Sequence, residues 1–301
     1  MTTYLQAPAE SVRNDDIEIF YSRSGEGPLM VLLHGFPDNE GSYAAQVEEL
    51  ARDHLVVTPR LRGFPPSSTP SEVERYALPL VADDIAALVE HLGQSPAIVV
   101  GHDWGGALAQ VVALRHSSLV AGLVLLNSPL LSTFNAMVNS NAEQQAMSSY
   151  TLPYLRYQPD DDKNIPFVTR NIRDPEWRAI IGTYLNENSI EGMLAYYKAN
   201  YPAPPYRPQA PAGHTFTLPT LLIWGMEEEY FAPAALDGLA KYYPASLRLV
   251  TVPGAGHWVH RDAAARVNGE IRSWLTMLPL LRGAEQEIGP TGSPSQSEQR
   301  T

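Results

Sequence analysis

The sequence predicts an α/β protein, in which helices cover both faces of a mostly parallel sheet and a helical segment is inserted in the middle of the chain. Three observations lead to this prediction. Short apolar runs typical of buried strands alternate with helical patterns on both sides of a central segment. A strand, a glycine-flanked turn and a helix follow one another over residues 97–116. Between about residues 129 and 216 strand patterns stop and helical patterns dominate.

The composition is that of an ordinary globular protein. The chain has 301 residues, of which 44% are hydrophobic and 18% charged. Its net charge of −12 argues against a nucleic-acid-binding protein, whose binding surface would be basic. No polybasic or long apolar stretch indicates binding to a membrane. The absence of cysteine excludes disulfides and thiolate metal sites. Residues 1–11 lack the pattern of a signal peptide, so we expect a soluble, cytoplasmic protein.

The first half of the chain predicts a hairpin followed by alternating strands and helices. Residues 17–22 alternate apolar and polar side chains, and the Gly-Glu-Gly-Pro turn at 25–28 joins them to a buried strand at 29–33. The elements expected after it are a helix at 41–51, a strand at 55–58, a helix at 80–92, a strand at 97–100, a helix at 107–116 and a strand at 122–126.

The second half begins with the inserted segment, which holds eight of the fifteen tyrosines. A strand at 220–224, a helix at 238–243 and a strand at 247–252 then resume the sheet. We therefore expect a core formed by residues 1–128 and 217–283 and a cap at 129–216. Residues 284–301 are rich in Gly, Ser, Pro, Gln and Glu and have little to bury, which predicts a disordered tail.

The turn between the strand and the helix at 97–116 places Asp103 between closely spaced glycines. Such a sharp turn exposes its middle residue in a strained conformation. A carboxylate there is ionised at neutral pH, since its ordinary pKa is about 3.9. It attacks a saturated carbon that carries a strained or good leaving group, which predicts epoxides or alkyl halides as substrates. The alternative is that this stretch is only a glycine-rich turn with a helix-capping aspartate. The other motifs decide between the catalytic and the structural interpretation.

Four motifs occur together in the chain: His34-Gly35-Phe36-Pro37, Gly101-His102-Asp103-Trp104-Gly105-Gly106, Trp224-Gly225-Met226-Glu227-Glu228 and Gly256-His257-Trp258. Together they resemble the α/β-hydrolase-fold epoxide hydrolases, and the likeness covers nearly the whole chain except its tail. This resemblance implies an eight-stranded α/β-hydrolase fold with a helical cap, and the opening of a small apolar epoxide to a vicinal diol without a cofactor. Asp103 would form an alkyl ester, which water then hydrolyses.

The resemblance also implies the partners of Asp103. His257 takes the position of the general base that activates water. The acid that orients His257 is Glu228 by similarity to the family pattern Trp-Gly-x-x-Asp. Because a longer glutamate replaces the usual aspartate, Glu227 and Glu229 remain alternatives. The backbone N–H groups of Phe36 and Trp104 would form the oxyanion hole.

Two cap tyrosines would protonate the oxygen that leaves the epoxide carbon, since a neutral phenol with a pKa near about 10 suits this role. Residues 193–198 are similar to the cap motif Asn-Trp-Tyr-Arg and place one donor at Tyr197. The second donor is Tyr154, with Tyr150 as the alternative, unless these rings only pack. We also expect four residues to contact the substrate: Phe36, Trp104, Tyr150 and Trp258.

Two other functions remain open. A haloalkane or haloacetate dehalogenase would share Asp103, Trp104 and His257, although Phe36 after His-Gly and Trp104 after the nucleophile favour an epoxide hydrolase. A non-catalytic small-molecule receptor would not need to keep nucleophile, base and acid together. We expect structural roles for His34 and His102. No metal is expected at the sequence-adjacent residues His257, His260 and Asp262.

Overall fold

The structure, a computed structural model, describes the backbone of residues 10–287 and the side chains of residues 10–278. Within this range eight strands form one sheet in the order β1-β2-β4-β3-β5-β6-β7-β8. The pairs β1–β2 and β2–β4 are antiparallel, and every pair from β4 to β8 is parallel. The strands are β1 Glu10–Asn14, β2 Ile17–Ser24, β3 Leu29–Leu33, β4 Leu55–Pro59, β5 Ala97–His102, β6 Val120–Leu126, β7 Thr220–Glu227 and β8 Leu247–Gly256. The predicted mostly parallel sheet is confirmed.

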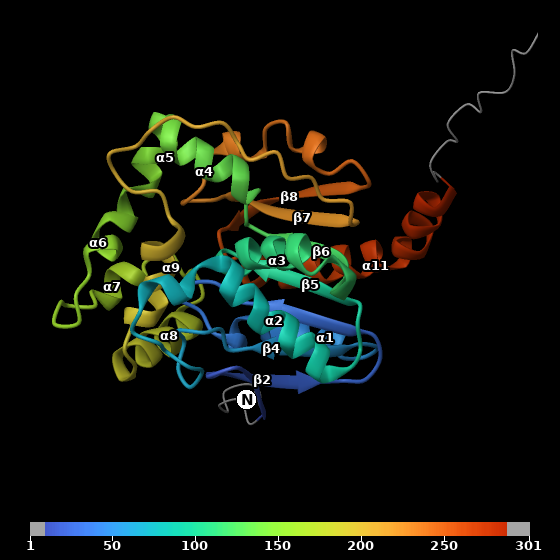
Figure 1. Ribbon diagram of the computed structural model, residues 1–301, viewed down its shortest axis with the longest axis horizontal. Coiled ribbons are helices and arrows are strands. Elements are labelled where there is room, and N and C mark those ends of the chain that lie inside the picture. The colour runs from blue at the N-terminus through green and yellow to red at the C-terminus, as the bar shows by residue number, and fades with distance from the viewer. Residues whose placement is uncertain (1–9, 288–301) are drawn as a thin grey trace, which may run out of the picture.

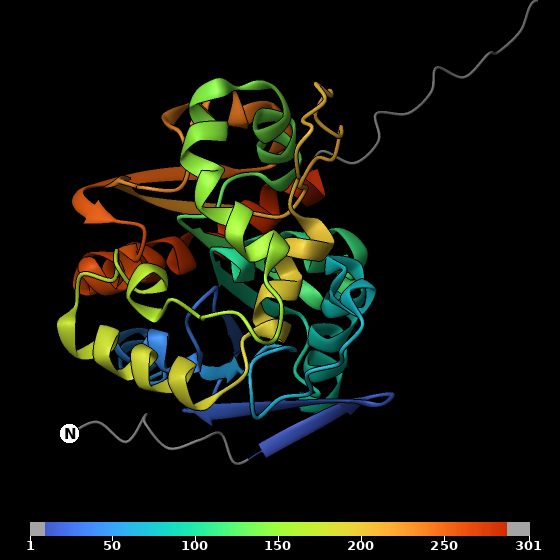
Figure 2. The same ribbon diagram turned by 90° about the vertical axis from the view of Figure 1, so that its left-hand side faces the viewer.

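Helices cover both faces of the sheet, and a second group of helices lies beside one end of it (Figure 1). The helices that pack on the sheet are α1 Ala44–Leu50, α2 Leu78–Leu92, α3 Trp104–Arg115, α10 Val259–Asp262 and α11 Ala264–Glu287. Those inserted between β6 and β7 are α4 Leu131–Ser140, α5 Ala142–Met147, α6 Thr151–Arg156, α7 Ile165–Val168, α8 Pro175–Glu187 and α9 Glu191–Asn200. The inserted helices face the viewer in Figure 2.

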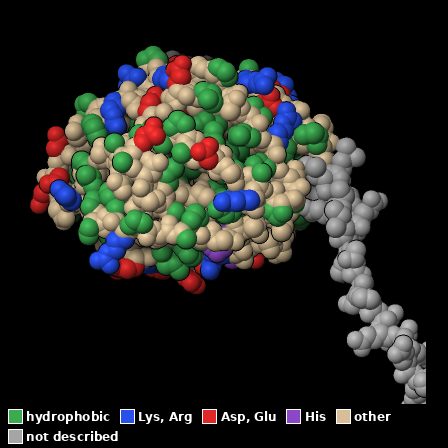
Figure 3. Space-filling model, turned by 90° about the horizontal axis from the view of Figure 1, so that it is seen from above, with side chains coloured by type: hydrophobic (Ala, Val, Ile, Leu, Met, Phe, Trp, Pro, Cys, Tyr) green, Lys and Arg blue, Asp and Glu red, His purple; other side chains and the backbone are tan. Residues whose placement is uncertain are grey.

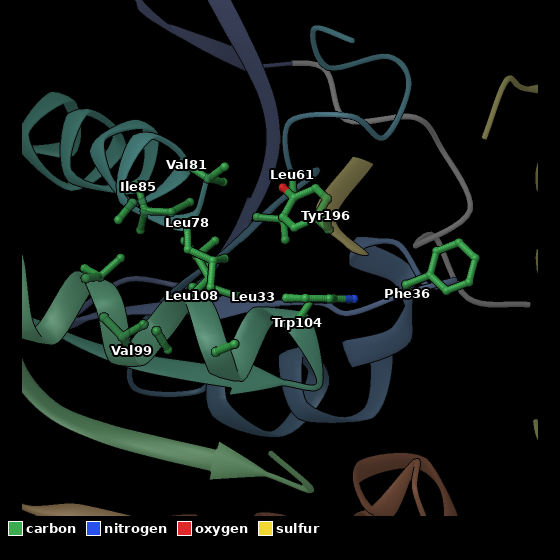
Figure 4. Close-up of a cluster of buried hydrophobic side chains, with 14 of the residues drawn as sticks. Leu33, Phe36, Leu61, Leu78, Val81, Ile85, Val99, Trp104, Leu108 and Tyr196 are labelled. Carbon is green, nitrogen blue, oxygen red and sulfur yellow. The ribbon is translucent and has the colours of Figure 1, made fainter. Parts of the chain in front are cut away.

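The central strands are buried on both faces because their side chains alternate between two cores. In β3, Val31 and Leu33 belong to the cluster that includes α2 and α3, whereas Met30 and Leu32 belong to the cluster that includes α1 and α11. Figure 4 shows part of the first cluster, in which the indole of Trp104 lies beneath Tyr196 and extends toward the side on which Phe36 lies. This packing fixes the carboxyl ends of the strands, where Asp103 lies.

Several predicted boundaries differ from the structure. The predicted helix at 238–243 is only a short 3-10 turn, Leu239–Tyr242, since Gly238 before it is left-handed and Pro244 follows closely. The helix predicted from residue 107 already begins at Trp104, because the turn at Asp103 is a single residue long. Residues 284–287 of the predicted tail belong to α11, and residues 288–301 lie outside the described residues.

Two surface properties accompany this fold. Acidic and basic side chains are interspersed on the face shown in Figure 3, without a continuous patch of either sign there. No helix within the described part of the chain is both long enough and apolar enough to cross a membrane.

Candidate active site

Asp103 lies in a turn that only glycine neighbours permit. Its own backbone has φ +53° and ψ −122°, a strained conformation for a residue with a side chain. A Cβ on Gly105 would lie 2.0 Å from the carbonyl oxygen of Leu33, and one on Gly101 would lie 2.3 Å from that of Gly105. The backbones of β3, β5 and α3 therefore meet without side chains between them. This close approach holds the Asp103 carboxylate at the carboxyl end of the sheet.

The side chain of Asp103 contacts a backbone donor and an imidazole. Its Oδ1 accepts a hydrogen bond of 2.9 Å from the N–H of Phe36. Its Oδ2 lies 3.6 Å from Nε2 of His257, and the two side chains are only 10% and 2% exposed. One carboxylate oxygen is thus held by the backbone, while the other faces the imidazole and remains free to react.

Glu228 contacts the opposite side of the His257 ring. Nδ1 of His257 lies 2.9 Å from Oε2 and 3.1 Å from Oε1 of Glu228. Because a carboxylate only accepts, this nitrogen carries a proton that it donates to Glu228. Glu228 is fixed in turn by Asn127 Nδ2, 2.6 Å from Oε2, and by the N–H of Tyr230, 2.8 Å from Oε1. The structure thus forms a continuous Asp103–His257–Glu228 array.

The two neighbouring glutamates lie differently. Glu227 is 58% exposed at its side chain and pairs with Arg173 at 2.9 Å. Glu229 lies 3.5 Å from the same guanidinium and accepts a long hydrogen bond of 3.4 Å from the backbone N–H of His257. Neither carboxylate contacts the imidazole ring, so among the three candidates only Glu228 lies where it can orient that ring.

The pKa values of the central pair are shifted in opposite directions by their mutual contact. Burial alone would lower the pKa of His257, but the charges and hydrogen bonds of Glu228 and Asp103 raise it to about 10. Burial would raise the pKa of Asp103, yet its hydrogen bond to His257 and the nearby imidazoles lower it. Both shifts favour the charged forms of this pair, an imidazolium beside the Asp103 carboxylate.

Three tyrosines of the inserted segment line the same cavities as Asp103. The ring centroids of Tyr154 and Tyr197 lie 5.1 Å apart, and both lie edge-on to Phe36 at 5.5 and 5.6 Å. Tyr150 lies 5.8 Å from the Tyr154 ring and 6.4 Å from the Tyr197 ring. The structure thus brings both predicted donors and the alternative donor together. Burial raises the pKa of Tyr197 well above its ordinary value and that of Tyr154 to about 12, so all three phenols are neutral at pH 7.

Two cavities meet at Asp103, Tyr150 and Tyr197. The larger of the two is largely apolar and contains Trp104 in its wall. The smaller is lined by Phe36, the tyrosines and His257. Phe36, Trp104 and Tyr150 therefore lie where a small molecule beside Asp103 would contact them. Residues of the inserted segment that also line these cavities, but had not been singled out from the sequence, are Pro129, Leu131, Phe134, Asn135, Val168 and Tyr201.

Trp258 lies elsewhere than expected. It lines neither of these two cavities, and its indole N–H donates to Asp38 Oδ2 at 2.9 Å. Trp177 donates to the other oxygen of Asp38 at 2.8 Å. Both indole N–H groups donate to this buried carboxylate, because burying a carboxylate without hydrogen-bond partners would cost free energy. Trp258 thus supports the loop behind His257.

The two other histidines of the motifs, His34 and His102, form hydrogen bonds with backbone groups. His34 accepts a 3.2 Å hydrogen bond from the N–H of Leu61, and His102 donates one of 3.0 Å to the carbonyl of His257. His102 and His260 also form, with Asp38, a buried group whose potential ligand atoms lie within 4.8 Å of one another. This group differs from the three sequence-adjacent residues considered above. The Asp38 oxygens already accept hydrogen bonds from two indoles and a serine, which fits a hydrogen-bond network better than a metal site.

Asn127 was missed in the sequence analysis. Its backbone has φ +38°, and its side chain bonds both to Glu228 and to the N–H of Gly225, 2.8 Å from its Oδ1. The available signal was its place directly after an apolar strand, at the sheet edge that also carries Asp103. Asparagine tolerates the left-handed conformation that this turn requires.

Comparisons with known proteins agree with this architecture. A family profile described as "alpha/beta hydrolase fold" matches residues 28–264. The chain is 31% identical over 284 residues to Epoxide hydrolase 3 of Xenopus tropicalis, covering 88% of this chain and 76% of that protein. It is 27% identical over 285 residues to Epoxide hydrolase 4 of Mus musculus, covering 88% and 78%.

Solved structures give the same result. A mutant of an epoxide hydrolase from Bacillus megaterium superposes with a TM-score of 0.78 at 26% identity, over 89% of this chain and all of that one. A chain described among novel epoxide hydrolases in metagenomes from hot environments also gives a TM-score of 0.78, at 27% identity, over 90% and 99%. With its eight-stranded sheet and its elbow at Asp103, the chain belongs to the epoxide hydrolase family of the α/β-hydrolase fold.

Proposed function

We propose that this protein hydrolyses epoxides to vicinal diols through a covalent ester on Asp103. One observation carries the proposal: Asp103, which lies 3.6 Å from the His257 imidazole, lines a single cavity with that imidazole and with the neutral phenols Tyr154 and Tyr197, and it also borders a largely apolar cavity. The relatives named epoxide hydrolases support it. We further infer that residues 1–128 and 217–283 are the core and that residues 129–216 are the cap that supplies the phenols.

In the first step Asp103 attacks an epoxide carbon. Oδ1 is held by the N–H of Phe36, so Oδ2 is the oxygen that forms the new C–O bond. The epoxide C–O bond breaks with its electron pair going to the leaving oxygen, which takes a proton from a cap tyrosine. A hydrogen bond to this oxygen strengthens as charge develops on it, so the tyrosines stabilise the transition state more than the bound substrate.

Ester formation changes His257 from a cation into a base. The ester carries no charge, so one of the two carboxylates that raise the pKa of His257 is lost. His257 then sheds a proton, which restores the tyrosine, and can accept another from water. Glu228 holds its Nδ1–H, which leaves Nε2 directed toward Asp103 and the water between them.

In the second step hydroxide is added to the carboxyl carbon of Asp103. The negative charge develops on Oδ1, which Phe36 already contacts, and the N–H of Trp104 is the second donor. The ester bond breaks, the diol oxygen takes the proton held by His257, and the remaining carboxyl proton of Asp103 returns to His257. The sum is one epoxide plus one water giving one diol.

A substrate panel tests the proposal. Purified protein is incubated with aryl and alkyl epoxides and with alkyl halides, and both diol and free halide are quantified. We expect diol from epoxides and no halide. Halide release without diol would establish a dehalogenase, and binding of epoxides without turnover would establish a receptor.

A further inference from the structure

Arg173 joins the inserted segment to the ends of strands β7 and β8. It lies between α7 and α8. Its Nη2 pairs with Glu227 at 2.9 Å and lies 3.5 Å from Glu229, the residues on either side of Glu228. Its Nη1 donates a hydrogen bond of 2.9 Å to the carbonyl of Gly254 in β8. One guanidinium from the inserted segment therefore contacts both strands.

The same guanidinium lies against the backbone beside His257. A Cβ added to Gly256 would lie 2.8 Å from Nη2 of Arg173, so the guanidinium packs directly on the residue before His257. Nε of Arg173 lies 3.7 Å from Asp262 Oδ2, which accepts the N–H of Gly256 at 2.8 Å. Glu229 accepts the N–H of His257 at 3.4 Å. Arg173 therefore meets two carboxylates that hold the backbone of this loop.

Three carboxylates surround this one cation. Within residues 10–278, no other lysine or arginine lies within 4.0 Å of Glu227, Glu229 or Asp262. The Arg173 side chain is 36% exposed, so water screens each pair and each contributes little to stability by itself. A guanidinium, however, presents its donors in a rigid planar fork. We therefore expect its effect on the relative position of the two strand ends and not on overall stability.

A second ion pair of reversed sign lies next to the first. Asp174 Oδ2 accepts a hydrogen bond of 2.6 Å from Arg261, whose guanidinium carbon lies 4.3 Å from the ring centroid of Trp177 on α8. This pair also joins the inserted segment to α10. Among the hydrogen bonds and ion pairs of residues 10–278, neither Asp174 nor Arg261 contacts residues 227–229 or 254–257. The pair therefore provides a matched control for docking of the segment alone.

We propose that Arg173 is a positioning residue that holds the loop of Glu228 and the loop of His257 at the separation their contact requires. Nδ1 of His257 lies 2.9 Å from Glu228 Oε2, and this contact orients the imidazole. The consequence for turnover rests on the proposed function. Ester hydrolysis, which uses His257 as a base, depends on Arg173, whereas the attack of Asp103 on the epoxide does not.

Step-resolved kinetics on the full chain test this role. Rapid quenching with an aryl epoxide gives the rates of ester formation and ester hydrolysis in Arg173→Gln, Arg173→Lys and the control Asp174→Asn. The control breaks the pair with Arg261 but keeps the Oδ1 atom that caps α8. We expect Arg173→Gln to slow hydrolysis about fivefold, the upper end for one partly exposed ion pair, with ester formation unchanged. Arg173→Lys should restore part of the rate, because it keeps the charge but not the fork. Asp174→Asn should match the wild type.

Hydrogen exchange distinguishes this role from docking of the inserted segment. Peptides that cover residues 225–231 and 254–262 should exchange faster in Arg173→Gln than in Asp174→Asn, with or without an epoxide. Equal slowing of hydrolysis by both variants, or unchanged exchange in Arg173→Gln, would overturn the inference. A wild type that forms no ester with any epoxide would refute the proposed function instead, and the exchange of these peptides would decide by itself whether Arg173 holds the two loops together.

Discussion

Replacing Glu228 with glutamine removes the charge beside His257 while keeping nearly the same shape. In the wild type, the Glu228 carboxylate accepts hydrogen bonds from His257 Nδ1 at 2.9 Å, from Asn127 at 2.6 Å and from the Tyr230 N–H at 2.8 Å. An amide has one oxygen, so one of these donors must face its NH₂ group. One unpaired buried donor costs about 1–3 kcal/mol, and loss of the charge adds to this. We expect ester hydrolysis to slow by roughly 10²–10⁴-fold.

The measurement separates the two steps of turnover. Rapid quenching gives the rate of ester formation on Asp103, and diol release gives overall turnover. In Glu228→Gln, ester should form at close to the wild-type rate and accumulate, since Asp103 is ionised without help from Glu228. Glu227→Gln and Glu229→Gln are the matched controls, because neither side chain contacts the imidazole ring. Wild-type turnover in Glu228→Gln together with a large loss in either control would refute the assignment.

Three further changes have defined outcomes. Tyr197→Phe should raise the alkylation barrier by about 2.7–4 kcal/mol, and adding Tyr154→Phe should abolish nearly all turnover; wild-type rates in the double variant would mean that the rings only pack. The pKa of His257 is raised to about 10. Its protonation therefore contributes fully to the free energy of unfolding below about pH 6.5, and this contribution is lost as the pH rises through 10. Denaturant unfolding should therefore show the stability difference between wild type and His257→Gln shrinking over this range, and a constant difference would argue against the charged pair. Gly269→Ala, on an exposed part of α11 with nothing within 4 Å of the added Cβ, should stabilise the protein by about 1 kcal/mol, and a lower Tm would contradict this.

The sheet was predictable because its strands bury both faces. Runs such as those at 29–33 and 97–100 carry apolar residues on every position, and only a parallel sheet covered on two sides accommodates them. The short 3-10 turn at Leu239–Tyr242 was not predictable, because its apolar spacing is that of a helix while Gly238 and Pro244 limit its length. Helix starts were also misplaced where a single-residue turn, as at Asp103, precedes them.

The site was predictable only where a motif fixed the geometry. Asp103 and His257 follow strands that end at one edge of the sheet, so their proximity follows from topology. Asn127 was not identified, since its role depends on a contact with Glu228 across 101 residues of sequence. Trp258 was expected to contact the substrate, but its indole N–H donates to Asp38. Sequence adjacency does not determine on which side of a loop a side chain lies.

The covalent intermediate is the central claim, and the mass of the His257→Gln variant tests it most directly. This variant keeps Asp103 and the tyrosines but removes the group that activates water, so ester should form and persist. After incubation with an epoxide, intact mass spectrometry should show an increase equal to the mass of that epoxide, and peptide mapping should place it on Asp103. An unmodified variant, under conditions where the wild type converts the same epoxide to diol, would mean that water attacks the epoxide directly.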